Sequence, residues 1–431
     1  MISFREHPQR RILADEAHAR PYLLLRAPVR LSHLAVMSGE GAQDADRAHV
    51  AQICRAFSVA PPPGDALHFA AKIGPLSLKW ERHSEFSSYT FAADGSFAQP
   101  FKEPPADHLP ADWLKGIPGE TIAALHIAIE SAAAPDRTVE ETAALFDNNT
   151  IIGSTVLGGQ ARVWTDARIH ADGFGRFLVK GADLNQRQLG RLVQRLVEIE
   201  TYRIMAMLAF PLARAARPQV AALEQELVAV VKRLPEITSV EDESALLKRL
   251  STLAAEAEGV TAGTAFRFSA ARAYTALTRQ RVEELREARL EWMQPLGEFL
   301  LRRMAPAMET CENVADRQES LSVRIARASD LLRTRVDVGV EAQNRDLLRS
   351  MNRRAKAQLR LQQTVEGLSV VAISYYLVGL VAYLAKALHG AGLRVDPEMA
   401  AGLSIPIVLP LVWLGVRRLR KGIVKRERDE D

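Results

Sequence analysis

The sequence predicts an α+β N-terminal domain around a mostly antiparallel sheet, followed by a long helical region and a C-terminal hairpin of two transmembrane helices. Strand-like runs and turn residues alternate through residues 1–182, whereas helix formers dominate residues 183–366. Two charge-free stretches of eighteen residues then lie near the C-terminus. The predicted segments are a cytoplasmic α+β domain (1–182), helical arms with a long stalk helix (183–366), a first transmembrane helix (367–389), a short extracytoplasmic linker (390–398), a second transmembrane helix (399–416) and a basic cytoplasmic tail (417–431).

The N-terminal domain is expected to begin with a strand at residues 29–37 and a helix at residues 42–59. Closely spaced strand-like runs follow, which indicates antiparallel hairpins. HADGFGRF, His170 to Phe177, is interpreted as a hairpin turn, with a phosphate-binding loop as the alternative. The remaining expected elements are strands at 67–73, 76–83, 85–93, 121–129, 150–159, 161–170 and 173–181, and a short helix at 138–146.

The helical region is expected to break at its prolines and paired glycines, and a coiled-coil arm is expected over residues 270–293. The last helix is expected to run without a break from about Ala307 into the membrane. Stacked shorter helices with kinks are the alternative. The expected breaks are Pro218, Pro235, Gly259, Gly263 and Pro306. The apolar seam of the last helix comprises Leu321, Ile325, Ala328, Leu332, Gly339, Leu347 and Met351.

Residues 368–385 and 399–416 are each long enough to cross the hydrocarbon core of a bilayer as a helix. Buried helices of a soluble domain are the alternative, which the flanking charges disfavour. Five basic residues precede the first stretch and seven follow within the tail, whereas the linker carries two basic and two acidic residues. The positive-inside rule therefore places both termini in the cytoplasm and the linker on the far side of the membrane.

One stripe of the first predicted span is small or polar throughout. Its residues recur at helical spacing, so they share one face. Such a stripe suits helix packing in lipid or the lining of a polar pathway. Two helices per chain cannot enclose a pore, so the second interpretation requires a ring of subunits. The stripe comprises Ser369, Ala372, Tyr376, Gly379 and Tyr383.

The string DEAHARP, residues 15–21, begins with the four letters that name a class of nucleic-acid helicases. A helicase also needs a G-x-x-x-x-G-K-[ST] loop, and the nearest stretch, residues 153–160, has Gly-Gln where Lys-Ser/Thr is required. The helicase interpretation is therefore rejected. On a short helix Glu16 and Arg20 are four residues apart and can pair. Together with His18 they form either a structural polar knot or a ligand site.

Composition narrows the chemistry further. The net charge of +4 gives no argument for nucleic acid as a partner. Cys54 and Cys311 fit no metal-site spacing, and no two histidines stand four residues apart. The N-terminus lacks the apolar core of a secretory signal. No cofactor is predicted, although a divalent cation remains a candidate ligand.

The order of α+β body, helical arms, very long helix, two spans and basic tail resembles the CorA-like two-span magnesium/cobalt channel superfamily. That resemblance implies a homo-oligomer, a pentamer in those channels, whose first spans surround a pore. The superfamily signature Gly-Met-Asn after the first span is absent, because the matching segment reads LAKALHGAGLRVDPE. Its absence counts against selection of hydrated magnesium.

Both ends of the chain also resemble an uncharacterised bacterial family of predicted membrane-anchored proteins, known only as a domain of unknown function. The resemblance rests on residues 13–36 and 360–380, and on an acid-x-His-Ala-Arg-Pro element that maps to Glu16, His18, Ala19, Arg20 and Pro21. It implies no established activity.

Three functions follow from these observations. The first is an oligomeric inner-membrane protein of CorA-like architecture that conducts, transports or senses a cation. The second is a membrane-tethered cytoplasmic scaffold or regulator with no conducting path and no enzymatic activity. The third, a membrane-anchored enzyme that uses Glu16 and His18, is disfavoured because no nucleophile, metal cluster or phosphate loop accompanies them. The lipid bilayer is the expected partner in each case.

Overall fold

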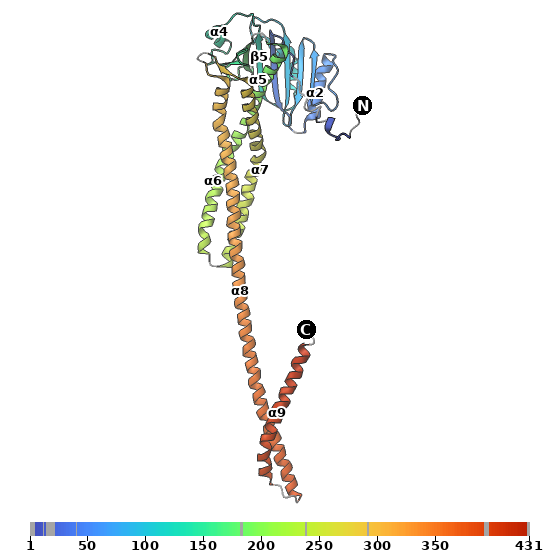
Figure 1. The fold of residues 1–431 in the computed structure, drawn as a ribbon, viewed down its shortest axis with the longest axis vertical. Coiled ribbons are helices and arrows are strands. Elements are labelled where there is room, and N and C mark those ends of the chain that lie inside the picture. Colours follow the sequence, from blue (N-terminus) through green and yellow to red (C-terminus); the bar gives the residue numbers. More distant parts are fainter. Residues whose placement is uncertain are drawn as a thin grey trace. The chain divides into compact units, whose positions relative to one another are not determined.

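A nine-stranded sheet forms the N-terminal part of the computed structural model (Figure 1). The structure describes residues 5–11, 13, 22–39, 41–181, 184–237, 239–290, 293–391 and 396–428. The strand order is β2-β3-β4-β1-β5-β8-β7-β6-β9. Every pair is antiparallel except β5 with β8, which confirms the predicted mostly antiparallel sheet. The strands are β1 (Val29–Met37), β2 (His68–Ile73), β3 (Leu76–Arg82), β4 (Ser87–Asp94), β5 (Glu120–Glu130), β6 (Ile152–Val156), β7 (Ala161–Thr165), β8 (Gly175–Gly181) and β9 (Ala288–Arg289).

Helices and short 3-10 turns complete the chain. Those within the sheet domain are α2 (Gln43–Ala56), η1 (Pro105–His108), α3 (Ala111–Lys115) and α4 (Val139–Ala144). The elements that follow β8 are α5 (Gln186–Met207), α6 (Ala209–Arg233), η2 (Leu234–Glu236), α7 (Val240–Leu285), α8 (Leu296–Gly390) and α9 (Pro397–Arg428).

Both faces of the sheet are covered, because both carry buried apolar side chains. On one face, Leu31, Ile127 and Val179 pack with Leu192 and Leu196 of α5. On the other face, a second core contains side chains of β1, β3, β4, α2 and α3 (Trp80, Tyr89, Phe91, Val50, Ile53 and Trp113). The sheet is therefore the middle layer of its domain.

Helix α5 crosses the N-terminal segment at a glycine. A Cβ atom on Gly190 would lie 1.9 Å from the carbonyl oxygen of Leu23, so only glycine permits this approach. The neighbouring Arg191 guanidinium lies over the Tyr22 ring, 5.4 Å from its centroid, and donates to the Tyr22 hydroxyl at 3.2 Å. Residues 22–25 are thereby fixed against α5.

Four of the five predicted helix breaks are wrong. Helix α7 continues through Gly259 and Gly263, α6 through Pro218 and α8 through Pro306, whereas Pro235 does lie in the break at η2. An interior glycine costs about 1 kcal/mol and a proline about 3 kcal/mol. The shared core of α5–α8 offsets these costs by burying apolar side chains such as Ala213, Phe268, Met308 and Cys311.

The predicted coiled-coil arm over residues 270–293 ends early. Helix α7 stops at Leu285, where Arg286 adopts a positive φ of 48°, and the chain then adds β9 to the edge of the sheet. The carbonyl oxygen of buried Leu285 accepts a hydrogen bond from the backbone amide of Leu157 at 2.8 Å. The residues after Leu285 therefore pair with the free edge of β6 instead of continuing helix α7.

The chain divides into two compact units. One contains Met1–Ile237 and Ser244–Ser329, so α5, α6 and most of α7 belong with the sheet. The other contains Thr238–Glu243 and Asp330–Asp431. The predicted domain boundary at residues 182–183 and linker residues 392–395 lie outside the described part of the chain.

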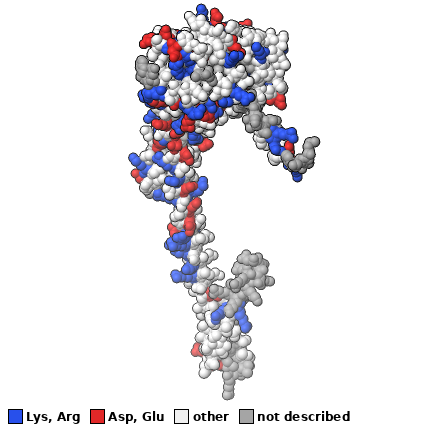
Figure 2. Space-filling model, turned by 45° about the horizontal axis from the view of Figure 1, so that its top comes forward, with Lys and Arg blue, Asp and Glu red and all other residues white. Residues whose placement is uncertain are grey.

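The second unit holds two helical segments that are long and apolar enough to cross a membrane, one in α8 and one at Pro397–Arg418. Helix α8 runs without a break into the first apolar segment, as expected, but it begins at Leu296 rather than at about Ala307 and ends at Gly390. Figure 2 shows the described residues of these segments as a largely white surface, because neither 368–385 nor 399–416 contains a charged side chain.

Each apolar segment has one narrow face that loses solvent exposure. The buried residues within these segments are Val370, Ser374 and Ala385 at 368–385 and Val412 at 399–416. The stripe predicted from sequence lies on other positions of α8. Ser369, Ala372, Tyr376 and Tyr383 are exposed and Gly379 is half-buried, so within one chain this stripe is left open.

Candidate functional site: an arginine-lined cleft beside a buried histidine

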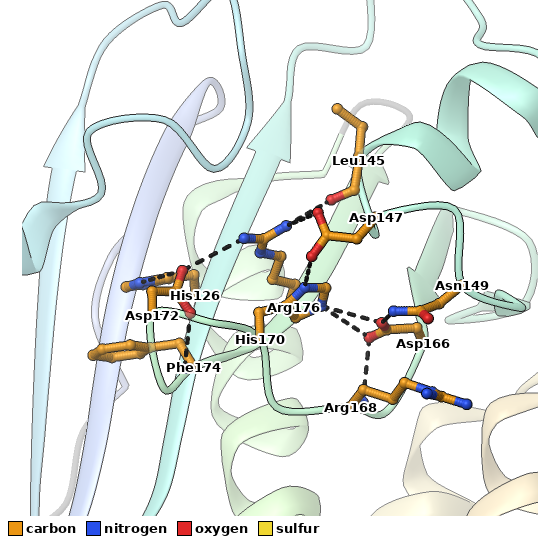
Figure 3. Close-up of polar contacts among 10 residues, drawn as sticks. All are labelled: His126, Leu145, Asp147, Asn149, Asp166, Arg168, His170, Asp172, Phe174 and Arg176. Atoms are coloured by element: carbon orange, nitrogen blue, oxygen red, sulfur yellow. Dashed lines mark hydrogen bonds and ion pairs between the residues drawn. The ribbon is translucent and has the colours of Figure 1, made fainter.

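Loop 166–174, between β7 and β8, carries a network of polar side chains (Figure 3). His170, whose side chain is 1% exposed, contacts two carboxylates. Its Nδ1 lies 2.8 Å from Asp147 Oδ2, and its Nε2 lies 3.1 Å from Asp166 Oδ2. The hydrogen bond from His170 holds the pKa of the Asp147 carboxyl below its usual value.

Asp166 shapes the loop as well as pairing with His170. Its carboxylate accepts from the backbone amide of Arg168 at 3.2 Å and from Asn149 Nδ2 at 2.9 Å. A side chain that binds the backbone two residues ahead forms an Asx turn, which fixes the local chain direction. Figure 3 shows the Arg168 side chain pointing away from Asp166 and His170. The buried network thus holds the backbone from which Arg168 projects.

Ser32, His126 and Asp172 form a second chain of contacts that superficially resembles a catalytic triad. Ser32 Oγ lies 3.0 Å from His126 Nδ1, and His126 Nε2 lies 4.0 Å from Asp172 Oδ2. However, Ser32 is fully buried, and its oxygen already accepts from the amide of Ala106. Burial lowers the pKa of His126 to about 4, so this ring is a neutral core histidine. A nucleophile needs access to substrate, so the arrangement is structural.

A cleft of about 750 Å³ opens beside this loop, entirely within the sheet-containing unit. Its volume falls in the range of small-molecule sites. Six segments line it: helix α4, the residues before β6, the loop after β7, the end of α5, the residues between β9 and α8, and the start of α8. An adjoining cavity of about 240 Å³ shares Arg168 and Arg203 with it.

The cleft combines arginines with an apolar wall. Arg203 is paired with Glu200, its Nη2 lying 2.5 Å from Glu200 Oε1. Arg168 and Arg303 are exposed, and neither contacts a carboxylate among the residues that the structure describes. The Arg303 guanidinium lies over the Phe299 ring, 4.5 Å from its centroid. The apolar side chains facing the same space are Ile151, Met207, Met293, Phe299, Leu300 and Met304.

None of the predicted site residues that the structure describes lines this cleft. Glu16, His18 and Arg20 lie outside the described residues, and Ser369 and its companions belong to the apolar part of α8. The three cleft arginines come from positions 168, 203 and 303, so no local motif joins them. The sequence does contain one indication that Arg303 could bind a ligand. It has no carboxylate three or four residues away, so it has no ion-pair partner of that spacing on its own helix.

No group of three or more histidine, cysteine, aspartate or glutamate side chains suited to a metal occurs among the described residues. The cleft therefore offers cationic and apolar contacts, not a ready metal centre. Guanidinium groups beside apolar side chains are suited to contact with an anion that carries an apolar part.

The whole chain was compared with known protein families and structures. A family model described as "Protein of unknown function (DUF3422)" matches residues 5–423. A search of the curated proteins gave no match. Among solved structures, "structure of the full-length CmaX protein" shares 14% identity, covers 70% of this chain and 94% of that chain, and has a TM-score of 0.18.

Proposed function

The chain belongs to the family of proteins of unknown function DUF3422, and within that family we propose that it is a membrane-anchored regulatory protein. Its sheet-containing unit is the ligand-responsive body, and its two apolar helices are the anchor. The observation that carries this proposal is that one helix, α8, contributes residues both to the cleft and to the anchor. The helix supplies Phe299, Leu300, Arg303 and Met304 to the cleft and residues 368–385 to the anchor.

Anchoring suits these segments better than a soluble core does. Within 368–385 and 399–416 most large apolar side chains are exposed, including Leu380 at 63% and Leu411 at 66%. A soluble protein rarely leaves so extended an apolar surface in water, whereas lipid accepts it. The basic residues that flank the two segments support a cytoplasmic body with a two-span anchor in an inner membrane.

Placing one arginine in each segment is expected to release the protein from membranes. In Leu377→Arg/Leu409→Arg each charge opposes insertion by about 3 kcal/mol at the centre of a span. The matched control is Leu347→Arg/Leu359→Arg, which changes two exposed leucines of α8 outside the segments. The measurement is the fraction that floats with vesicles after an alkaline carbonate wash. The proposal is wrong if the parent chain stays soluble, or if both double variants float equally.

A second candidate is a CorA-like homo-oligomer that conducts a divalent cation. The open stripe favours it, because Tyr376 and Tyr383 are exposed and can present their hydroxyl groups to neighbouring subunits, whereas Ser369 Oγ already donates to the Val365 carbonyl at 2.9 Å. A pentamer in detergent is then expected, and Tyr376→Leu should change Mg²⁺ flux into vesicles. Tyr375→Leu, an adjacent exposed tyrosine outside the stripe, should leave it unchanged. A monomer or dimer in detergent would exclude this candidate, because too few helices would surround a path.

A further inference from the structure

We propose that the cleft binds a phosphate monoester with an apolar or aromatic body, held between Arg168 and Arg303. This inference deepens the proposed function, on which it rests, by naming the class of ligand to which the sheet-containing unit responds. It depends on the geometry of the cleft and not on the membrane anchor.

The charge of the cleft selects the anionic group. Arg168 and Arg303 reach the cleft from two separate elements, the loop after β7 and helix α8. Both lack a carboxylate partner among the described residues, whereas Arg203 has Glu200. Two guanidinium groups approaching from different segments match an anion that carries between one and two charges and three acceptor oxygens. A phosphate monoester near neutral pH has both properties.

The remaining lining selects the apolar body. Phe299 presents an aromatic ring, and Met207, Met293 and Met304 add flexible thioethers that adapt to flat rings or chains. Arg303 stacks on Phe299, so the cation and the ring form one continuous contact surface. Inorganic phosphate alone would leave this wall in contact with water. A volume of about 750 Å³ also exceeds what a bare phosphate ion needs.

The loop network explains why Arg168 is available for a ligand. Asp166 is buried and already accepts from His170, Asn149 and the Arg168 amide. Its carboxylate therefore fixes the Arg168 backbone without receiving the Arg168 guanidinium. Asp166 and His170 act as positioning residues and Arg168 as the binding residue.

The test is calorimetric titration of the full-length chain in detergent with phenyl phosphate, and separately with inorganic phosphate, benzoate and phenol. Phenyl phosphate is expected to bind at least about tenfold more tightly than each of the other three, because it alone has both the doubly charged group and the ring. Each titration is corrected with a protein-free detergent blank.

Matched arginine variants locate the site. Arg303→Gln and Arg168→Gln are each expected to weaken phenyl phosphate binding about tenfold, the usual effect of losing one charge-assisted contact. Arg302→Gln is the control, because Arg302 is exposed and next to Arg303 on α8 but does not line the cleft. All three side chains are exposed, and melting temperatures within a few degrees of the parent verify folding.

Three outcomes would overturn the inference: no binding of phenyl phosphate, equal affinity for inorganic phosphate, benzoate or phenol, or equal losses in Arg302→Gln and Arg303→Gln. None of these outcomes bears on whether the two apolar segments anchor the protein, which the flotation experiment tests separately. Conversely, a chain that binds phenyl phosphate but fails to float would leave the ligand site standing and overturn the proposed membrane role.

Discussion

Replacing Asp46 with alanine is expected to destabilise the sheet domain by about 3–5 kcal/mol, because the change leaves the buried Arg82 guanidinium without its counter-charge. The two side chains are 0% and 1% exposed, and Arg82 Nε lies 3.6 Å from Asp46 Oδ2. The same carboxylate oxygen accepts from Ser38 Oγ at 2.7 Å and from Ser87 Oγ at 2.6 Å. Removing it therefore also leaves two hydroxyl groups without their acceptor.

Asp44 provides a matched control on the same helix. It lies one half-turn from Asp46 in α2, its side chain is 94% exposed, and it pairs with Arg47 at 3.1 Å. Exposed ion pairs contribute about 0–1 kcal/mol, so Asp44→Ala should have little effect. The measurement is guanidinium-induced unfolding followed by tryptophan fluorescence, since Trp80 lies in the same core. Similar losses in the two variants would show that burial of the pair does not matter.

Lowering the pH from 7.5 to 4.5 is expected to remove about 5 kcal/mol of unfolding free energy from the sheet domain. His33 and His126 are both almost fully buried. Burial, aided by the nearby charge of Lys79, lowers the pKa of His33 to about 3, and burial lowers that of His126 to about 4. At pH 4.5 each ring then costs about 2.5 kcal/mol relative to an unfolded chain with a pKa of 6.5.

The sign follows from proton counting. Between the folded and unfolded pKa values the unfolded chain binds more protons than the folded chain, so stability falls as the pH falls. The loss begins near pH 6.5 and levels off below about pH 4 for His126 and about pH 3 for His33. Above pH 6.5 both rings are neutral in either state, and their contribution to the folded state is fully present.

Histidine variants separate this effect from the titration of carboxylates. His126→Gln should reduce the loss between pH 7.5 and pH 4.5 by about 2.5 kcal/mol. His108→Gln removes an exposed histidine and is the control. Unfolding titrations at the two pH values give the comparison for each chain. The explanation fails if His126→Gln loses as much stability as the parent.

Local patterns identified most elements of the sheet domain. The run Val29–Met37 was predicted as a strand and is β1, and HADGFGRF was predicted as a turn and joins β7 to β8 in an antiparallel pair. These predictions succeed because the two-residue alternation of a strand and the glycine of a turn each depend on only a few neighbouring residues. The helix breaks at Pro218, Gly259, Gly263 and Pro306 failed, because the shared core of α5–α8 outweighs a local penalty.

The cleft could not be predicted in the same way. Arg168 depends on the Asx turn of Asp166, and that carboxylate is fixed by His170 and Asn149, which lie on opposite sides of it in the sequence. Arg303 reaches the same space only because β9 ends α7 early and α8 begins beside β6. Neither arginine belongs to a sequence motif. The strand order, and not their spacing in the sequence, brings the two side chains to the same cleft.

The sheet-then-helix order, the mostly antiparallel pairing and the two charge-free C-terminal segments could be predicted from the amino-acid sequence, because periodicity and apolar length are local properties. Three features required the folded chain: β9 pairs with the edge of the sheet, Asp46 lies beside Arg82, and Arg168 and Arg303 share one cleft. Each of these joins residues from separate elements, so the packing of the whole unit, and not any one segment, fixes it.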